Sequence, residues 1–131
     1  MFFQLKLTST PKPPTATPNP TATPTPVVFS VTSVTASVDP ANHSGTCPKQ
    51  FNFSAQITSN TAGTVTYKWE RSDGAGASTQ SLSFSGAATQ TVTDSWTLGG
   101  SGFSYSGWEK VTILTPNSTS SNQANFTLAC S

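Results

Sequence analysis

Hydrophobic and polar residues alternate along short segments of the chain from about residue 28 onward. The clearest example is Phe51, Phe53, Ala55 and Ile57, which alternate with polar residues. This is the period of a β-strand that buries one face, and no segment sustains the 3.6-residue period of an amphipathic helix. Seven such runs are separated by turn-forming clusters rich in Gly, Asn, Asp, Ser and Pro. They centre on residues 28–38, 51–57, 65–69, 82–84, 92–98, 111–113 and 124–130.

The number and spacing of these runs predict an all-β domain. Seven short strands joined by turns are typical of a seven-stranded antiparallel two-sheet sandwich of the immunoglobulin-like kind. The first run changes phase, because Phe29 and Val31 lie on one face and Val34, Ala36 and Val38 on the other. A β-bulge near residues 32–33 would bring both halves onto the same core.

The residues before the first run have a different composition. Seven of the ten prolines fall between residues 8 and 26, with almost no apolar side chains among them. Such a segment cannot bury enough surface to offset its backbone entropy, and its prolines favour stiff, extended chain. We therefore expect residues 1–27 to form a disordered N-terminal stub and Thr/Pro-rich linker, and residues 28–131 to form the domain. Residues 1–7 are too short for a complete export signal, so secretion would require a signal outside this sequence.

The two cysteines lie at the start of the second run and at the end of the last. If successive strands reverse direction, Cys47 and Cys130 come to the same pole of the sandwich. We therefore expect a disulfide, which implies an oxidising compartment and an extracellular or cell-surface location. The alternative is a pair of reduced, buried thiols in a cytosolic protein.

Charged residues make up only 8% of the chain, and the formal net charge is +1. The basic residues are scattered along the sequence, whereas binding to phosphate groups requires clustered cations. No stretch approaches the roughly 20 apolar residues that span a bilayer. We therefore expect neither nucleic acid nor a membrane as partner, and we expect the domain to be part of a longer multidomain chain.

Two segments resemble a known family. Residues 65–74, VTYKWERSDG, resemble the strand-and-turn signature Y-x-W-x-F-G-D-G of PKD-type immunoglobulin-like domains, with Ser72 in place of a glycine. Residues 107–113, GWEKVTI, resemble the later G-x-Y-x-V-x-L strand of that family, without its tyrosine. The resemblance implies a bacterial extracellular module that serves as a spacer, an adhesion unit or a ligand-recognition unit.

Catalytic and metal-binding patterns are missing from the sequence. The single histidine, His43, has Asp39 nearby but no nucleophile on a strained turn, so a catalytic triad is not indicated. There is no CxxC, HxxxH or EF-hand pattern, which leaves no predicted metal or cofactor. Asp73 can contribute to a calcium site, but in a Ser-Asp-Gly turn it is expected to accept local backbone hydrogen bonds. The sequence predicts a protein that is not an enzyme.

One acidic residue interrupts an apolar face. Asp94 is in phase with Val92 and Trp96, so its side chain is expected to point inward. A buried carboxylate requires a partner, and Lys68, Arg71 or Lys110 is the expected cation.

Aromatic residues provide the best indication of a ligand-binding surface. Tyr105 and Phe103 lie in a glycine-rich segment next to Trp108, and Trp96 lies on the preceding run. Aromatic residues in strands usually belong to the core, but an exposed group can stack on sugar rings. A carbohydrate-binding module on a Pro/Thr linker is therefore the alternative to a spacer or adhesion unit, and the ligand would be an unknown protein or polysaccharide.

Overall fold

The computed structural model describes residues 27–131, and nearly all of the predicted stub and linker lies outside this range. The regular secondary structure of the described part consists only of strands, which confirms the predicted fold class. Seven of them correspond to the seven predicted runs, and the two short strands β2 and β8 are additional. The strands are β1 (Val31–Asp39), β2 (Asn42–Gly45), β3 (Lys49–Ser59), β4 (Gly63–Arg71), β5 (Gln80–Phe84), β6 (Ala88–Leu98), β7 (Ser104–Thr115), β8 (Thr119–Ser120) and β9 (Ala124–Cys130).

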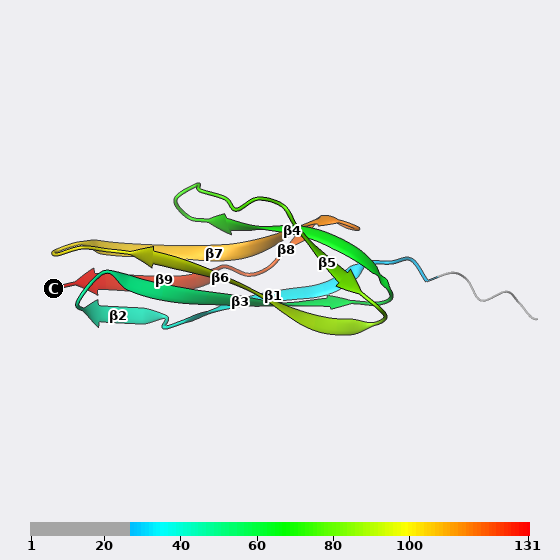
Figure 1. Ribbon diagram of the computed structural model, residues 1–131, viewed down its shortest axis with the longest axis horizontal. Helices are drawn as coiled ribbons and strands as arrows, with labels where there is room; N and C mark the ends of the chain where they lie inside the picture. Colours follow the sequence, from blue (N-terminus) through cyan, green and yellow to red (C-terminus); the bar gives the residue numbers. More distant parts are fainter. Residues whose placement is uncertain (1–26) are drawn as a thin grey trace, which may run out of the picture.

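The strands form two facing sheets (Figure 1). The smaller sheet has the order β1-β3-β6, and the larger has the order β2-β9-β7-β4-β5 with β8 paired to β7. All pairs are antiparallel except β2 with β9, which is parallel. The sandwich is therefore not purely antiparallel as predicted, because the polar segment that follows β1 passes alongside the last strand. That segment has no hydrophobic alternation, which is why the sequence indicated a turn there.

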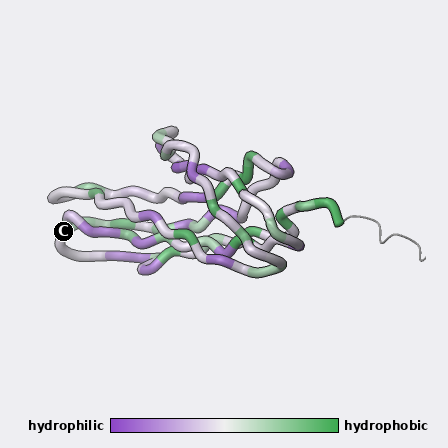
Figure 2. Tube along the Cα trace, turned by 45° about the vertical axis from the view of Figure 1, so that its right-hand side comes forward, coloured by the Kyte–Doolittle hydropathy of each residue, from purple (hydrophilic) through white to green (hydrophobic). Residues whose placement is uncertain are grey.

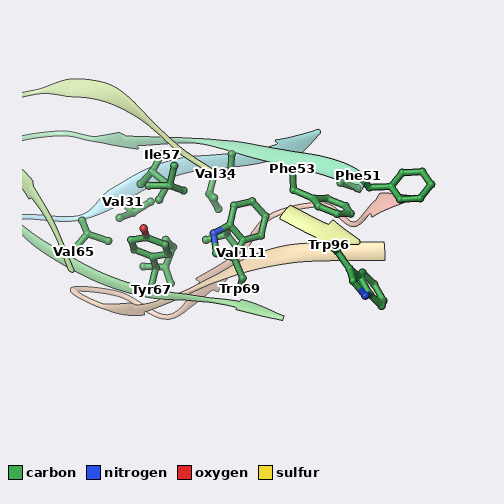
Figure 3. Close-up of a cluster of buried hydrophobic side chains, with 14 of the residues drawn as sticks. Val31, Val34, Phe51, Phe53, Ile57, Val65, Tyr67, Trp69, Trp96 and Val111 are labelled. Atoms are coloured by element: carbon green, nitrogen blue, oxygen red, sulfur yellow. The ribbon is translucent and has the colours of Figure 1, made fainter. Parts of the chain in front are cut away.

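The core lies between the two sheets. The inward residues of β3 are almost completely buried, including Phe51, Phe53 and Ile57. Phe126 of β9 packs on them, with its ring centroid 4.4 Å from that of Phe51. Figure 3 shows Phe53 and Ile57 between the strands, with Phe51 and Trp96 at one end of the cluster. Figure 2 shows hydrophobic and hydrophilic residues interspersed along the strands. Each large side chain buried in this way stabilises the fold by roughly 1.5–3 kcal/mol.

The predicted bulge in the first strand is confirmed. The register between β1 and β3 shifts between Val31 and Ser33. As a result both Val31 and Val34 are buried, although they are three positions apart.

The predicted disulfide is present between Cys47 and Cys130, with a Cα–Cα distance of 5.6 Å. It joins the loop before β3 to the end of β9, at one pole of the sandwich. Gly99 lies against it, and a Cβ at that position would come within 2.7 Å of the Cys130 sulfur. The backbone there also has φ of +105°, so the close approach favours glycine for two reasons.

The chain enters the domain at the opposite pole from the disulfide (Figure 1). Asn60, in the turn between β3 and β4, anchors the entering segment. Its Oδ1 accepts a hydrogen bond from the Ser30 amide (2.8 Å), and its Nδ2 donates to the Val28 carbonyl oxygen (2.7 Å). Val27 and Val28 are themselves exposed. Residues 27–131 include no helix with the length and hydropathy needed to cross a membrane.

Candidate functional site

Most charged residues of the described domain gather in one region. Residues 27–131 contain nine charged residues, and only Asp39 and Lys49 lie elsewhere. The other seven lie on β4, on β7, on the facing part of β6 and at the start of the loop after β4. We call them the charged cluster: Lys68, Glu70, Arg71, Asp73, Asp94, Glu109 and Lys110.

The register between two strands builds this cluster. Glu70 of β4 pairs with Lys110 of β7, and Arg71 pairs with Glu109. Because side chains alternate between the two faces of a sheet, Glu70 and Lys110 lie on the outer face, and Glu109 faces the core. The charged cluster therefore has an outer half in contact with solvent and an inner half between the sheets.

Trp108 lies among the residues of the outer half of the charged cluster. Its ring is partly exposed, and the Lys110 ammonium lies 5.6 Å from the ring centroid, in cation–π geometry. Glu70 lies between two cations, with Oε1 3.4 Å from Lys68 Nζ and Oε2 3.7 Å from Lys110 Nζ. The Thr112 hydroxyl also donates to Glu70 at 2.8 Å. That hydrogen bond, followed by the charge of Lys68, lowers the pKa of Glu70, so this carboxylate is ionised at neutral pH.

The loop after β4, residues 72–79, forms one wall beside Trp108. Ser72 anchors it, because the Ser72 amide donates to the Trp108 carbonyl oxygen (2.9 Å) and the Trp108 amide donates to Ser72 Oγ (3.1 Å). Arg71 and Asp73 form a bidentate ion pair at its start, and Asp73 also accepts from the Ala75 amide at 2.9 Å. Asp73 therefore acts as the local turn acceptor that its sequence context predicted.

The loop and the sheet enclose a cleft of about 380 Å³, which we call the Trp108 cleft. Its walls combine one aromatic ring, three cations and one carboxylate with the small residues of the loop. It is lined by Trp108, Lys110, Lys68, Glu70, Arg71 and, from the loop, Gly74, Gly76 and Ala77.

Gly107 is required for the fit between the loop and the strand. A Cβ at this position would lie 2.3 Å from the Tyr105 ring and 2.7 Å from Ser72 Oγ. Tyr105 and Ser72 form a hydrogen bond of 2.9 Å through their hydroxyl groups at the same place. A side chain at position 107 would therefore displace the residue that anchors the loop.

Glu109 dominates the inner half of the charged cluster. It is 0% exposed, and neither of its carboxyl oxygens has a hydrogen-bond partner among the described residues. Burial and, secondly, the neighbouring Asp94 raise the pKa of Glu109 to about 9. The Glu109 side chain is consequently a neutral carboxylic acid at pH 7.

Asp94 points inward as predicted, and it is half-buried. Burial and, secondly, the charge of Asp94 raise the pKa of Tyr67 in the core. The prediction of a cation partner is wrong for the part of the chain that the structure describes. Lys68 and Lys110 pair with Glu70 on the outer face, and Arg71 pairs with Asp73, so Asp94 forms no ion pair there.

The four predicted aromatic site residues divide between two places. Trp108 lies alone on the outer face of the larger sheet. Phe103 and Tyr105 stack near the disulfide pole, with centroids 6.1 Å apart and planes inclined by 14°. Trp96 is 8% exposed and packs edge-on against Tyr105, and Arg71 covers its ring at 4.2 Å. The structure therefore does not bring Trp108, Tyr105 and Phe103 together on one surface.

A larger hollow, of about 620 Å³, lies on the outer face of the three-stranded sheet. Asp39, Gln50, Asn52 and Ser95 are among its lining residues, and Phe53 is buried beneath it. Its lining offers hydrogen bonds but no exposed ring. The Trp108 cleft provides both, so we regard it as the candidate site.

The sequence contains a signal for part of this site. Val111 and Ile113 alternate with polar residues in the predicted run 111–113, and extending this alternation back to residues 108 and 109 places Glu109 inward and Trp108 outward. The grouping of cations was not predicted, since Lys68, Arg71 and Lys110 are scattered along the sequence. His43, the other chemically notable residue, donates from Nε2 to the Thr46 carbonyl oxygen at 2.9 Å.

Comparisons with known proteins identify a fold and no family. No protein-family model matches the sequence, and no curated protein matches it. Among solved structures, the CARDB domain of the PF1109 protein from Pyrococcus furiosus, in complex with di-metal ions, is similar. It has a TM-score of 0.50 at 13% identity, over 75% of this chain and 92% of that one.

A second similar structure is the alkylpurine DNA glycosylase AlkC of Pseudomonas fluorescens, bound to DNA containing an abasic site analog. The TM-score is 0.51 at 15% identity, and the match covers 73% of this chain but only 30% of that one. At such identities the likeness extends to the β-sandwich fold alone.

Proposed function

We propose that this chain is a non-catalytic extracellular recognition module that binds a polysaccharide in the Trp108 cleft. The observation that carries the proposal is the concentration of charge around one partly exposed tryptophan, in a domain that is otherwise almost uncharged. A β-sandwich can be stabilised by its core and its backbone hydrogen bonds, so these charges are better explained by a ligand than by the fold.

The chemistry of the cleft fits a sugar ring. The apolar face of a pyranose stacks on an indole ring, and its hydroxyl groups form hydrogen bonds with charged side chains. The Trp108 cleft offers the ring together with the donors of Lys68 and Lys110 and the acceptor oxygens of Glu70. Because Ser72 anchors the loop wall to β7, the cleft is pre-organised, which favours binding.

The location and the attachment are part of the same proposal. A disulfide between Cys47 and Cys130 favours an oxidising compartment. The Thr/Pro-rich segment before residue 27 would hold the module away from the preceding part of a longer chain. We propose neither nucleic acid nor membrane as partner, because every cation of the cluster is near a carboxylate that offsets its charge.

Tryptophan fluorescence with soluble polysaccharides tests the proposal. Soluble xylan, carboxymethylcellulose and polygalacturonate are suitable probes, and at least one of them should shift or quench the emission. Trp108→Ala should weaken that binding by about tenfold or more, because it removes the stacking surface. Leu114→Ala is the matched control, since Leu114 is an exposed residue on the same face of β7.

Other outcomes distinguish the alternatives. Loss of binding in Phe103→Ala and not in Trp108→Ala would move the site to the Phe103–Tyr105 stack. No response to any polysaccharide would contradict the proposal and favour a pure spacer. Hydrolysis of a bound polysaccharide would contradict the non-catalytic assignment.

A further inference from the structure

The two edges of the three-stranded sheet differ in their protection. At the β1 edge, two asparagine side chains take the place of a neighbouring strand. Asn117 Oδ1 accepts from the Val31 amide (2.7 Å) and its Nδ2 donates to the Val31 carbonyl oxygen (3.1 Å). Asn122 does the same at Ala36, at 2.8 and 2.9 Å. These amides occupy backbone groups that a further strand would use.

The β6 edge has no comparable cover. Over its 11 residues, Ala88–Leu98 pairs with β3 on one side without a register shift. Within residues 27–131, no backbone hydrogen bond is formed by the other side of β6. The edge strands of the larger sheet, β2 and β5, have only 4 and 5 residues. The longest unprotected edge in the described domain is therefore β6.

The composition of β6 gives it little of the usual protection of an edge strand. Edge strands commonly carry lysine, proline, a bulge or inward-pointing charged residues that prevent pairing with another chain. β6 contains no lysine, proline or bulge, and Asp94 is its single inward-pointing charged residue. Its outward row is entirely hydroxylated and exposed: Thr89, Thr91, Thr93, Ser95 and Thr97.

We propose that β6 pairs with β6 of a second copy of this chain, antiparallel about a two-fold axis at Thr93. The two three-stranded sheets would then join into one continuous sheet of the order β1-β3-β6-β6-β3-β1. Antiparallel pairing across a two-fold axis requires a strand that is complementary to itself. The outward row of β6 meets this requirement, because it presents hydroxyl groups in both directions from Thr93.

The pairing continues a pattern already present in the domain. Hydroxyl groups meet across neighbouring strands at Thr58–Thr89 (2.7 Å) and at Ser37–Ser54 (2.9 Å). With Thr93 opposite itself, Thr91 lies opposite Ser95 and Thr89 opposite Thr97, so every outward pair is a hydroxyl pair. The same register places Asp94 opposite Val92 of the other copy, which keeps the two Asp94 carboxylates from lying directly opposite each other.

Two double variants that add lysines, one on β6 and a control on β1, test the proposed interface. Thr91→Lys/Ser95→Lys would place lysine opposite lysine at two positions, which is unfavourable across a strand pair. Thr35→Lys/Ser37→Lys adds the same charge to the same face of the sheet on the protected strand β1. Sedimentation equilibrium should show a concentration-dependent dimer of the wild type. Its dissociation constant should rise about tenfold or more in the β6 variant and change less than about twofold in the β1 variant.

The outcomes decide the proposal. A wild-type chain that stays monomeric at the highest soluble concentration, or a dimer that both variants weaken equally, would overturn it. Thr93→Cys then tests the register, because cysteines that face each other across the two-fold axis are close enough to form a disulfide. Thr93→Cys should cross-link into a covalent dimer on oxidation, while Ser37→Cys should not. Equal cross-linking of both variants, or of neither, would overturn the register.

Discussion

The three-stranded sheet and the β4–β7 pair differ in the kind of polar side chain that they carry. β1, β3 and β6 contribute only Asp39, Lys49 and Asp94 as charged residues, and their outer faces consist mostly of hydroxyls and amides. β4 and β7 contribute five charged residues within a few positions of one another. Both regions are parts of the same sandwich, so the sparsely charged sheet indicates that a sheet of this fold can form with few charges. The charges on β4 and β7 are therefore expected to add little stability, or to reduce it.

Removing the covalent link should have the largest effect. Cys47→Ser/Cys130→Ser should lower the free energy of unfolding by about 4.5 kcal/mol, because the unfolded chain regains the freedom of a loop closed across 83 positions. Urea denaturation with and without reductant measures the effect. An unchanged midpoint in dithiothreitol would contradict a stabilising disulfide.

Substitution of Glu109 should have the next largest effect, and it should stabilise the fold. The pKa of Glu109 is raised from an ordinary value of 4.5 to about 9, so the folded state binds a proton that the unfolded state releases at neutral pH. Burial of Glu109 therefore leaves the free energy of unfolding undiminished below pH 4.5, where the side chain is protonated in both states. Between pH 4.5 and about pH 9 the free energy of unfolding decreases by about 1.4 kcal/mol per pH unit. Glu109→Gln should raise the free energy of unfolding by about 2 to 3 kcal/mol at pH 7 and remove this pH dependence.

Glu70→Gln is the matched control for Glu109. Glu70 is partly exposed and its neighbours are cations and a hydroxyl donor, so its substitution should change stability by less than about 1 kcal/mol. Chemical denaturation between pH 4 and pH 9 compares the two variants. If both change stability equally, burial of Glu109 is not the cause.

Removing an asparagine that hydrogen-bonds to the edge of β1 should cause a smaller loss of stability. Asn117→Ala removes two hydrogen bonds to Val31 and should lower the free energy of unfolding by about 1 to 2 kcal/mol. Asn125→Ala is the control, because Asn125 is exposed and makes only one long contact with the backbone. Thermal unfolding of the two variants measures the difference, and equal melting temperatures would show that these hydrogen bonds do not stabilise the β1 edge.

The sequence predicted the features that depend on local alternation and on cysteine position. Alternation was enough to predict the strands β3 and β6 and the inward direction of Asp94. The phase change at residues 32–33 was enough to predict the bulge. The disulfide followed from strand direction alone. The short strands β2 and β8 were not predicted, since strands of so few polar residues exist only because a neighbour pairs with them.

The candidate site depends on contacts between distant residues, so less of it could be predicted. The pairing of Arg71 with Glu109 and of Glu70 with Lys110 follows from the register between β4 and β7, which no local pattern determines. The sequence singled out Trp108, but it grouped Trp108 with the two aromatic residues on the other side of the sheet. Alternation along 107–113 contains the information that separates them.

The disulfide also determines how much of the chain can unfold and extend when a pulling force acts on this domain. A pull between residue 27 and Ser131 acts along the long axis of the molecule, because the two ends lie at opposite poles. The load passes through β1, where the β1–β3 hydrogen bonds are sheared together, and reaches Cys47. From there it crosses the sulfur bridge directly to Cys130. Only the segment before Cys47 can therefore lengthen, while β3 to β9, including the Trp108 cleft, stay outside the path of the load.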